Sequence, residues 1–106
     1  RRKEMFISGG ENVYPAEVEA ALSAHPDIIE CAVLGVPHAT WGEVGLAAIA
    51  LRADAEVDAS HFEAWLRQHV AGYKRPRELL FLPALPKTAA GKFNKPEILR
   101  LHAARQ

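Results

Sequence analysis

Two long apolar segments, separated by a few residues, constrain the fold of this 106-residue chain most strongly. Residues 28–36 are rich in β-branched side chains and are followed by Pro37, and a second apolar segment covers residues 43–51. Apolar runs of this length and composition are typical of buried strands. We therefore predict two buried strands, the first closed by Pro37, with a loop at residues 38–42 between them.

Shorter signals give the remaining elements. In chain order we expect a strand at 5–7, a turn-rich stretch at 8–12, a helix opened by Tyr14–Pro15 and ended by residues 25–27, a polar turn at 52–57, a helix at 58–70, a basic loop at 71–77, a strand at 78–82, a long loop at 83–92 and a helix starting at 95–97. Asp58, or Ser60 together with Glu63, is the expected cap of the second helix. The order β-α-β-β-α-β-α predicts an α+β fold, a small sheet covered by about three helices.

Length and composition exclude several classes of protein. A chain this short holds one core, so residues 1–106 form one domain. With 49% apolar and 25% charged residues, disorder is not expected. No apolar run approaches the ~20 residues of a membrane helix, and the basic start lacks the apolar stretch of a signal peptide. The formal net charge of zero gives no support for a nucleic-acid partner.

The zero net charge conceals an uneven distribution. Residues 4–71 carry eleven acids and two bases, whereas residues 72–106 carry eight bases and two acids. Such asymmetry is typical of a protein with an anionic partner, although a solvated basic tail explains it equally well.

The cysteine and the histidines indicate no metal site. Cys31 stands alone within a predicted strand, so it is expected to pack in the core as a small apolar residue. A single cysteine excludes an internal disulfide and suits a reducing cytoplasm, where we expect the protein to be. The five histidines have no zinc-site spacing, and His69, on an apolar stripe with Phe62, Trp65 and Leu66, is expected to be packed.

Four motifs, spread over the chain, carry a resemblance. They are Arg1-x-Lys3-Glu4-Met5-x-Ile7-Ser8-Gly9-Gly10-Glu11-Asn12-Val13-Tyr14-Pro15-x-Glu17-Val18-Glu19, Val36-Pro37…Trp41-Gly42-Glu43, Tyr73-Lys74-Arg75-Pro76 and Leu85-Pro86-Lys87-Thr88-x-x-Gly91-Lys92. In this order and spacing they resemble the C-terminal domain of the adenylate-forming enzymes, specifically the AMP-forming acyl-CoA synthetases. The resemblance covers essentially the whole chain, and Glu4 departs mildly from the family's usual aspartate.

This resemblance implies that residues 1–106 are a C-terminal lid domain whose partner is a large N-terminal domain of the same enzyme. The enzyme would convert a carboxylic acid, with a lean toward fatty acids, to an acyl adenylate and then to acyl-CoA, with ATP and CoA as substrates. Mg²⁺ is expected with ATP, held by the phosphates and the other domain. The family's lid turns between two poses about a hinge that aligns with Lys3, and Arg1 aligns with an arginine that contacts the adenylate. We expect the lid alone to be inactive.

Lys92 is the candidate catalytic and ATP-binding residue. When a carboxylate attacks the α-phosphorus of ATP, negative charge builds on the phosphate oxygens, and a positioned ammonium group stabilises it. Gly91 would let the loop reach into a cleft, and Thr88 would pin its backbone. From spacing alone, Lys92 is a surface lysine after a turn glycine, whereas the resemblance favours catalysis.

The Gly9–Gly10 pair, Glu11 and Trp41 are candidate CoA-binding residues. Glycines without a β-carbon would let thin pantetheine pass close to the backbone, although an ordinary strand-to-helix turn would also use them. The resemblance places Glu11 and Trp41 near the thiol end of this tunnel, where Glu11 would orient or deprotonate the thiol. Trp41 could equally be a loop anchor packed on the sheet.

The segment 73–77 is the candidate site for the nucleotide end of CoA. Tyr73 offers a flat face for adenine, and Arg75 and Arg77 offer guanidinium groups for phosphates. In an extended segment stiffened by Pro76, the two arginines would point the same way. A solvated basic loop is the alternative.

Two other functions remain open. The same lid could serve an enzyme that loads a carrier protein, or the chain could be a non-catalytic binding module.

Overall fold

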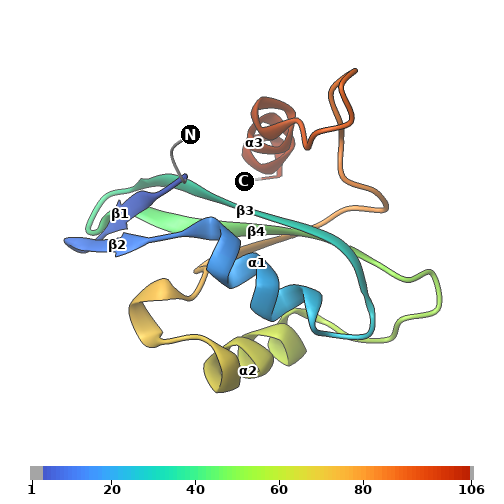
Figure 1. Cartoon of the computed structure of the whole chain (residues 1–106), viewed down its shortest axis with the longest axis horizontal. Helices are drawn as coiled ribbons and strands as arrows, with labels where there is room; N and C mark the ends of the chain where they lie inside the picture. The colour runs from blue at the N-terminus through green and yellow to red at the C-terminus, as the bar shows by residue number, and fades with distance from the viewer. Residues whose placement is uncertain (1–3, 106) are drawn as a thin grey trace.

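The computed structural model describes residues 4–105, which form one five-stranded sheet with helices on both faces (Figure 1). The elements are β1 (Phe6–Ser8), β2 (Glu11–Val13), α1 (Pro15–Ser23), β3 (Ile28–His38), β4 (Gly42–Leu51), α2 (Ala59–His69), a 3₁₀ helix (Gly72–Lys74), β5 (Glu78–Phe81) and α3 (Lys95–Ala104). The predicted α+β class, a small sheet with three covering helices, is confirmed.

The two apolar segments form the β3–β4 hairpin at the centre of the fold. β4 pairs antiparallel with β3 from Leu51 opposite Ile28 to Gly42 opposite His38, and parallel with β5. At its start β4 also meets β1, so the main path runs β2-β1-β4-β3. β4 therefore pairs directly with β1, β3 and β5, and β2 joins the sheet through β1.

Both faces of the hairpin are largely buried, which explains why its strands are mostly apolar. Side chains on one face, including Val33 and Ile49, pack with α1 and α2, and those on the other, including Leu34 and Leu46, pack with Ile98 of α3. Figure 1 shows α1 and α2 on one side of the sheet and α3 on the other. Successive strand residues therefore enter apolar clusters on opposite faces of the one sheet.

Three local predictions were wrong. Residues 8–12 were expected to form a turn-rich stretch, but Glu11 and Asn12 belong to strand β2, because Gly9 and Gly10 join two strands in a tight hairpin rather than a strand to a helix. Pro37 does not close its strand: it pairs with Glu43, and β3 is an edge strand, where a missing N–H is tolerated. Within the expected loop 71–77, Gly72–Lys74 forms a 3₁₀ helix.

The helix signals were more reliable. Asp58 caps α2 by accepting the backbone N–H of His61 (3.1 Å), so Asp58 rather than Ser60 is the cap. Asn94 caps α3 in the same way through Glu97 N–H (3.1 Å). On α2, Phe62 and Leu66 are buried as expected, but His69 is exposed and stacks on Trp65 instead of entering the core. Among residues 4–105, no helix combines the length and apolarity needed to cross a membrane.

Candidate functional site

Lys92 lies in a small hairpin between β5 and α3. Lys87 pairs with Phe93, Thr88 N–H donates to the carbonyl of Lys92 (2.7 Å), and Gly91 N–H donates to that of Thr88 (2.9 Å). Gly91 has φ +85°, the left-handed conformation that lets a three-residue hairpin loop close. The glycine thus shapes the turn, and Figure 1 shows this segment (orange-red) standing away from the sheet.

The side chain of Lys92 is exposed at this hairpin, and its ammonium makes no ion pair with the residues that the structure describes. Lys87, at the start of the same hairpin, is instead paired with Glu30 of β3. Of the two lysines in this hairpin, Lys92 is therefore the one available to an external anion.

The β1–β2 turn and the β3–β4 loop meet at Gly9 and Trp41. Gly9 N–H donates to the Trp41 carbonyl (2.9 Å), and a β-carbon on Gly9 would lie 2.5 Å from Cε3 of the indole. Gly9 and Gly10 have φ +57° and +85°, as a two-residue hairpin turn requires. Trp41 is thus a loop anchor, yet 40% of it remains exposed.

Arg77 joins this cluster. Its guanidinium carbon lies 4.9 Å from the centroid of the Trp41 ring, a cation–π distance. The structure therefore brings together Gly9, Trp41 and Arg77, three of the seven residues assigned to CoA from sequence. Glu11 is exposed on the same hairpin, opposite Ser8, and Gly10 has open space around it.

Arg75 contacts a different element from Arg77. Its Nε donates to the carbonyl of Val70 (2.8 Å) and its Nη2 to that of Arg67 (3.5 Å), both at the C-terminal end of α2. A guanidinium in this position satisfies carbonyls that have no partner within the helix and complements the helix dipole. Arg75 therefore contacts the end of α2, whereas Arg77 contacts the ring of Trp41.

Tyr73 is exposed in the 3₁₀ helix that precedes them. The neighbouring Lys74 donates to Glu17 of α1 (2.9 Å) and lies 5.6 Å from the centroid of the Tyr73 ring. Its hydrogen bond with Glu17 raises the pKa of the Lys74 ammonium. This lysine was not among the predicted site residues, and its ion pair fixes residues 72–74 against α1.

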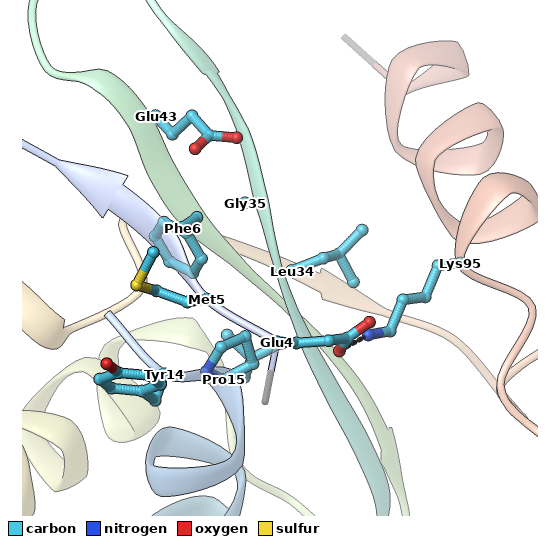
Figure 2. A pocket seen from close by; sticks show the side chains of 10 residues that line it. Glu4, Met5, Phe6, Tyr14, Pro15, Leu34, Gly35, Glu43 and Lys95 are labelled. Atoms are coloured by element: carbon cyan, nitrogen blue, oxygen red, sulfur yellow. Dashed lines mark hydrogen bonds and ion pairs between the residues drawn. The ribbon is translucent and has the colours of Figure 1, made fainter. Parts of the chain in front are cut away.

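The predicted hinge Lys3 and the predicted adenylate contact Arg1 lie outside the described residues. Glu4, which follows them, forms an ion pair with Lys95 at the start of α3. Figure 2 shows this pair on the wall of an open pocket of about 730 Å³, which Phe6, Pro15 and Leu34 also line. Sequence reasoning did not find this contact, since its partners are 91 positions apart.

Comparisons with known proteins identify the domain. The family described as "AMP-binding enzyme C-terminal domain" matches residues 17–92, more than half of the chain. The chain belongs to this family. The match includes Trp41, the segment 73–77 and Lys92, so these candidates lie within the AMP-binding enzyme C-terminal domain proper.

Relatives of this domain include several CoA ligases. Feruloyl-CoA synthase of an Amycolatopsis species is 48% identical over 94% of this chain and 20% of its own length. The 2-succinylbenzoate–CoA ligase of Geobacillus kaustophilus is 46% identical over 95% of this chain and 21% of its own length. The chain thus spans about a fifth of the length of these relatives.

Solved structures agree with the fold. The fatty acyl CoA synthetase of Mycobacterium tuberculosis superposes with a TM-score of 0.85 at 36% identity, covering 95% of this chain and 20% of that one. The apo structure of MatB from Rhodopseudomonas palustris superposes with a TM-score of 0.89 at 35% identity, covering 96% of this chain and 20% of that one. The AMP-binding enzyme C-terminal domain is therefore the fold of this chain.

Within residues 4–105, no three histidine, cysteine or acidic side chains lie together so that they could hold a metal ion. The described residues therefore offer the expected Mg²⁺ no set of protein ligands.

Proposed function

We propose that this chain is the C-terminal lid domain of an AMP-forming acyl-CoA synthetase and that Lys92 stabilises the transition state of adenylation. The substrate carboxylate attacks the α-phosphorus of ATP, the bond to pyrophosphate breaks, and an acyl adenylate forms. Negative charge grows on the non-bridging oxygens during this step. An ammonium that meets this charge lowers the barrier more than it strengthens ground-state binding.

One observation carries the proposal: Lys92 presents an ammonium that forms no ion pair among residues 4–105, from a hairpin that projects from the sheet, within a domain of the AMP-binding enzyme C-terminal family. The hairpin has internal backbone hydrogen bonds, so it carries the charge as a defined unit. The complete enzyme would supply the remaining ATP and acyl contacts from its N-terminal domain.

In the second half-reaction, the CoA thiol attacks the acyl carbon and AMP leaves. We assign Arg77 and Tyr73 to the nucleotide end of CoA, because both are exposed and Arg77 lies against the ring of Trp41. Gly9, Gly10, Glu11 and Trp41 are assigned to the pantetheine arm. Arg1, Lys3 and Arg75 keep their proposed roles as adenylate contact, hinge and CoA contact.

We propose fatty acids as the first candidates for the carboxylic acid substrate, to be tested with a panel of acids. Relatives named for ferulate, 2-succinylbenzoate and indoleacetate widen the panel to aromatic acids. We place the enzyme in the cytoplasm, a compartment that suits the free thiol of Cys31.

The test separates the two half-reactions in the complete enzyme. Lys92→Ala should reduce pyrophosphate release by about 10²-fold or more, the usual cost of losing one charge-stabilising donor. Thioester formation from a supplied acyl adenylate should stay within about twofold. Arg100→Ala, which removes an exposed cation of α3, is the matched control and should leave both steps unchanged. An equal loss in both half-reactions for Lys92→Ala would contradict the proposal.

A further inference from the structure

Glu30 is a charged residue within an otherwise apolar stretch of β3, and its carboxylate reaches out of the sheet to the segment that precedes Lys92. Its Oε1 accepts the backbone N–H of Leu85 (3.2 Å), and its Oε2 accepts a hydrogen bond from Lys87 Nζ. The two contacts span 55 and 57 positions in sequence. One side chain of the rigid sheet thus holds two points of the loop.

These two points form the base of the Lys92 hairpin. Leu85 is buried in the same core as Ile98 of α3, which fixes the start of the segment. Lys87 opens the hairpin by pairing with Phe93, and the next residue, Thr88, donates to the carbonyl of Lys92. A short path therefore leads from Glu30 through Lys87 and Thr88 to the residue that carries the proposed catalytic charge.

The returning arm of the hairpin is anchored separately. Asn94 N–H donates to the carbonyl of Pro86 (2.8 Å), and the Asn94 side chain caps α3. The outgoing arm of the hairpin is the segment that follows β5. The Glu30 side chain connects this arm to the sheet through Leu85 and Lys87. Loss of that contact would release Lys87 from the sheet while Leu85 stayed in its core and α3 held the returning arm, so the tip would shift without the domain unfolding.

Glu30 is suited to this task because it stays ionised. The hydrogen bond from Lys87, helped by the one from Leu85, holds the pKa of the Glu30 carboxyl below its usual value. Its side chain is 22% exposed, so the pair is partly shielded from water. A charge-assisted contact in that setting is stronger than a fully exposed ion pair.

We infer that Glu30 is a positioning residue for adenylation, which sets the place of Lys92 by clamping Leu85 and Lys87 at the base of its hairpin. This inference rests on the proposed function of Lys92. Misplacement of a reacting group by ~1 Å can cost about 10²-fold in rate, so a contact at the base of the hairpin can matter as much as one at its tip.

The experiment measures both half-reactions of the complete enzyme with Glu30→Gln and Lys87→Met. Glutamine keeps an acceptor for Leu85 N–H but loses the charge that holds Lys87. Both variants should lower kcat for pyrophosphate release about tenfold, leave the KM for ATP within about twofold, and leave thioester formation from a supplied acyl adenylate unchanged. Glu97→Gln, on α3, is the matched control and should change neither step.

A double-mutant cycle with Lys92→Ala separates positioning from general stability. If Glu30 acts through Lys92, Glu30→Gln should add no further loss of adenylation in the Lys92→Ala background. The charge-swapped pair Glu30→Lys with Lys87→Glu should recover part of the lost rate. Equal loss in both half-reactions, or full additivity with Lys92→Ala, would overturn the inference. If Lys92→Ala itself leaves adenylation intact, the proposed function fails instead.

Discussion

The indole ring of Trp41 occupies the space into which a β-carbon on Gly9 would project. An ideal β-carbon there would lie 2.5 Å from Cε3 and 2.9 Å from Cζ3 of the ring. The contact joins the tip of the β1–β2 hairpin to the loop between β3 and β4, and the Gly9–Trp41 backbone hydrogen bond adds to it. Two loops assigned to CoA from separate motifs therefore behave as one structural unit.

Gly9→Ala should destabilise the domain and impair the CoA step. Alanine at φ +57° costs about 1–2 kcal/mol, and displacement of the indole adds an overpacking cost of about 1–3 kcal/mol. Urea unfolding of the chain and the KM for CoA of the complete enzyme measure the two effects. Gly72→Ala, with open space around it, is the control and should be nearly neutral. Trp41→Ala should relieve only the overpacking part, so an unchanged cost of Gly9→Ala in that background would refute the contact.

Arg75 and Arg77 should both contribute to the KM for CoA, but Arg75 should contribute less, because its guanidinium is held by carbonyls at the end of α2. Arg77→Ala should raise the KM for CoA about tenfold, because it removes an exposed guanidinium that could meet a phosphate, while urea unfolding stays within about 0.5 kcal/mol of wild type. Arg75→Ala should lower the free energy of unfolding by about 1 kcal/mol, because two carbonyls at the end of α2 lose their donor. A larger change in KM for Arg75→Ala than for Arg77→Ala would reverse the assignment.

The parts of the fold that could be predicted were those with local signals. Asp58, Pro15 and the apolar strands 28–36 and 43–51 act within a few residues of themselves, so helix starts and the central hairpin followed from sequence. β2 was missed because Glu11-Asn12-Val13 has too little apolar character, and only its pairing with β1 makes it a strand. The prediction that Pro37 closes its strand was wrong for a similar reason. A residue without a backbone N–H is tolerated at this position because β3 is an edge strand.

The candidate site was harder to predict because its contacts are long-range. The family resemblance singled out Lys92 and Trp41, but not the long-range contacts around each of them. Glu30 carried a usable signal, because it is a lone charge inside an apolar strand. A buried strand tolerates such a charge only when it is paired. The Glu4–Lys95 pair carried none, because its two residues lie near opposite ends of the chain and neither interrupts an apolar segment.

Cys31 should resist alkylation in the folded protein. Burial raises the pKa of its thiol, and Ser23 Oγ and the Glu19 carbonyl lie within hydrogen-bonding distance of Sγ (3.4 and 3.6 Å). Since the thiolate is the reactive form, iodoacetamide at pH 8 should modify the native chain at least about tenfold more slowly than the urea-unfolded chain. Equal rates in the two states, followed by mass spectrometry, would contradict the buried placement.

The His25–His61 pair should make the domain less stable in mild acid. His25 is buried, its Nε2 lies 2.6 Å from Nε2 of His61, and its Nδ1 accepts the N–H of Asp27 (3.0 Å). Burial, followed by the neighbouring His61, holds the pKa of His25 below its usual 6.5. Between that lowered pKa and 6.5, the unfolded chain binds a proton that the folded chain does not, so the free energy of unfolding falls as the pH drops below about 6.5.

Protonation of His25 also removes the acceptor for Asp27 N–H, which links the charge to the turn between α1 and β3. Urea unfolding at pH 7.5 and 5.5 measures the loss, and His61→Gln should make it smaller because one of the two causes disappears. His69→Gln is the control: that ring lies on the same helix but is exposed against Trp65, so its replacement should leave the pH dependence unchanged. A loss of stability that is the same in His61→Gln and His69→Gln would show that the pair does not govern it.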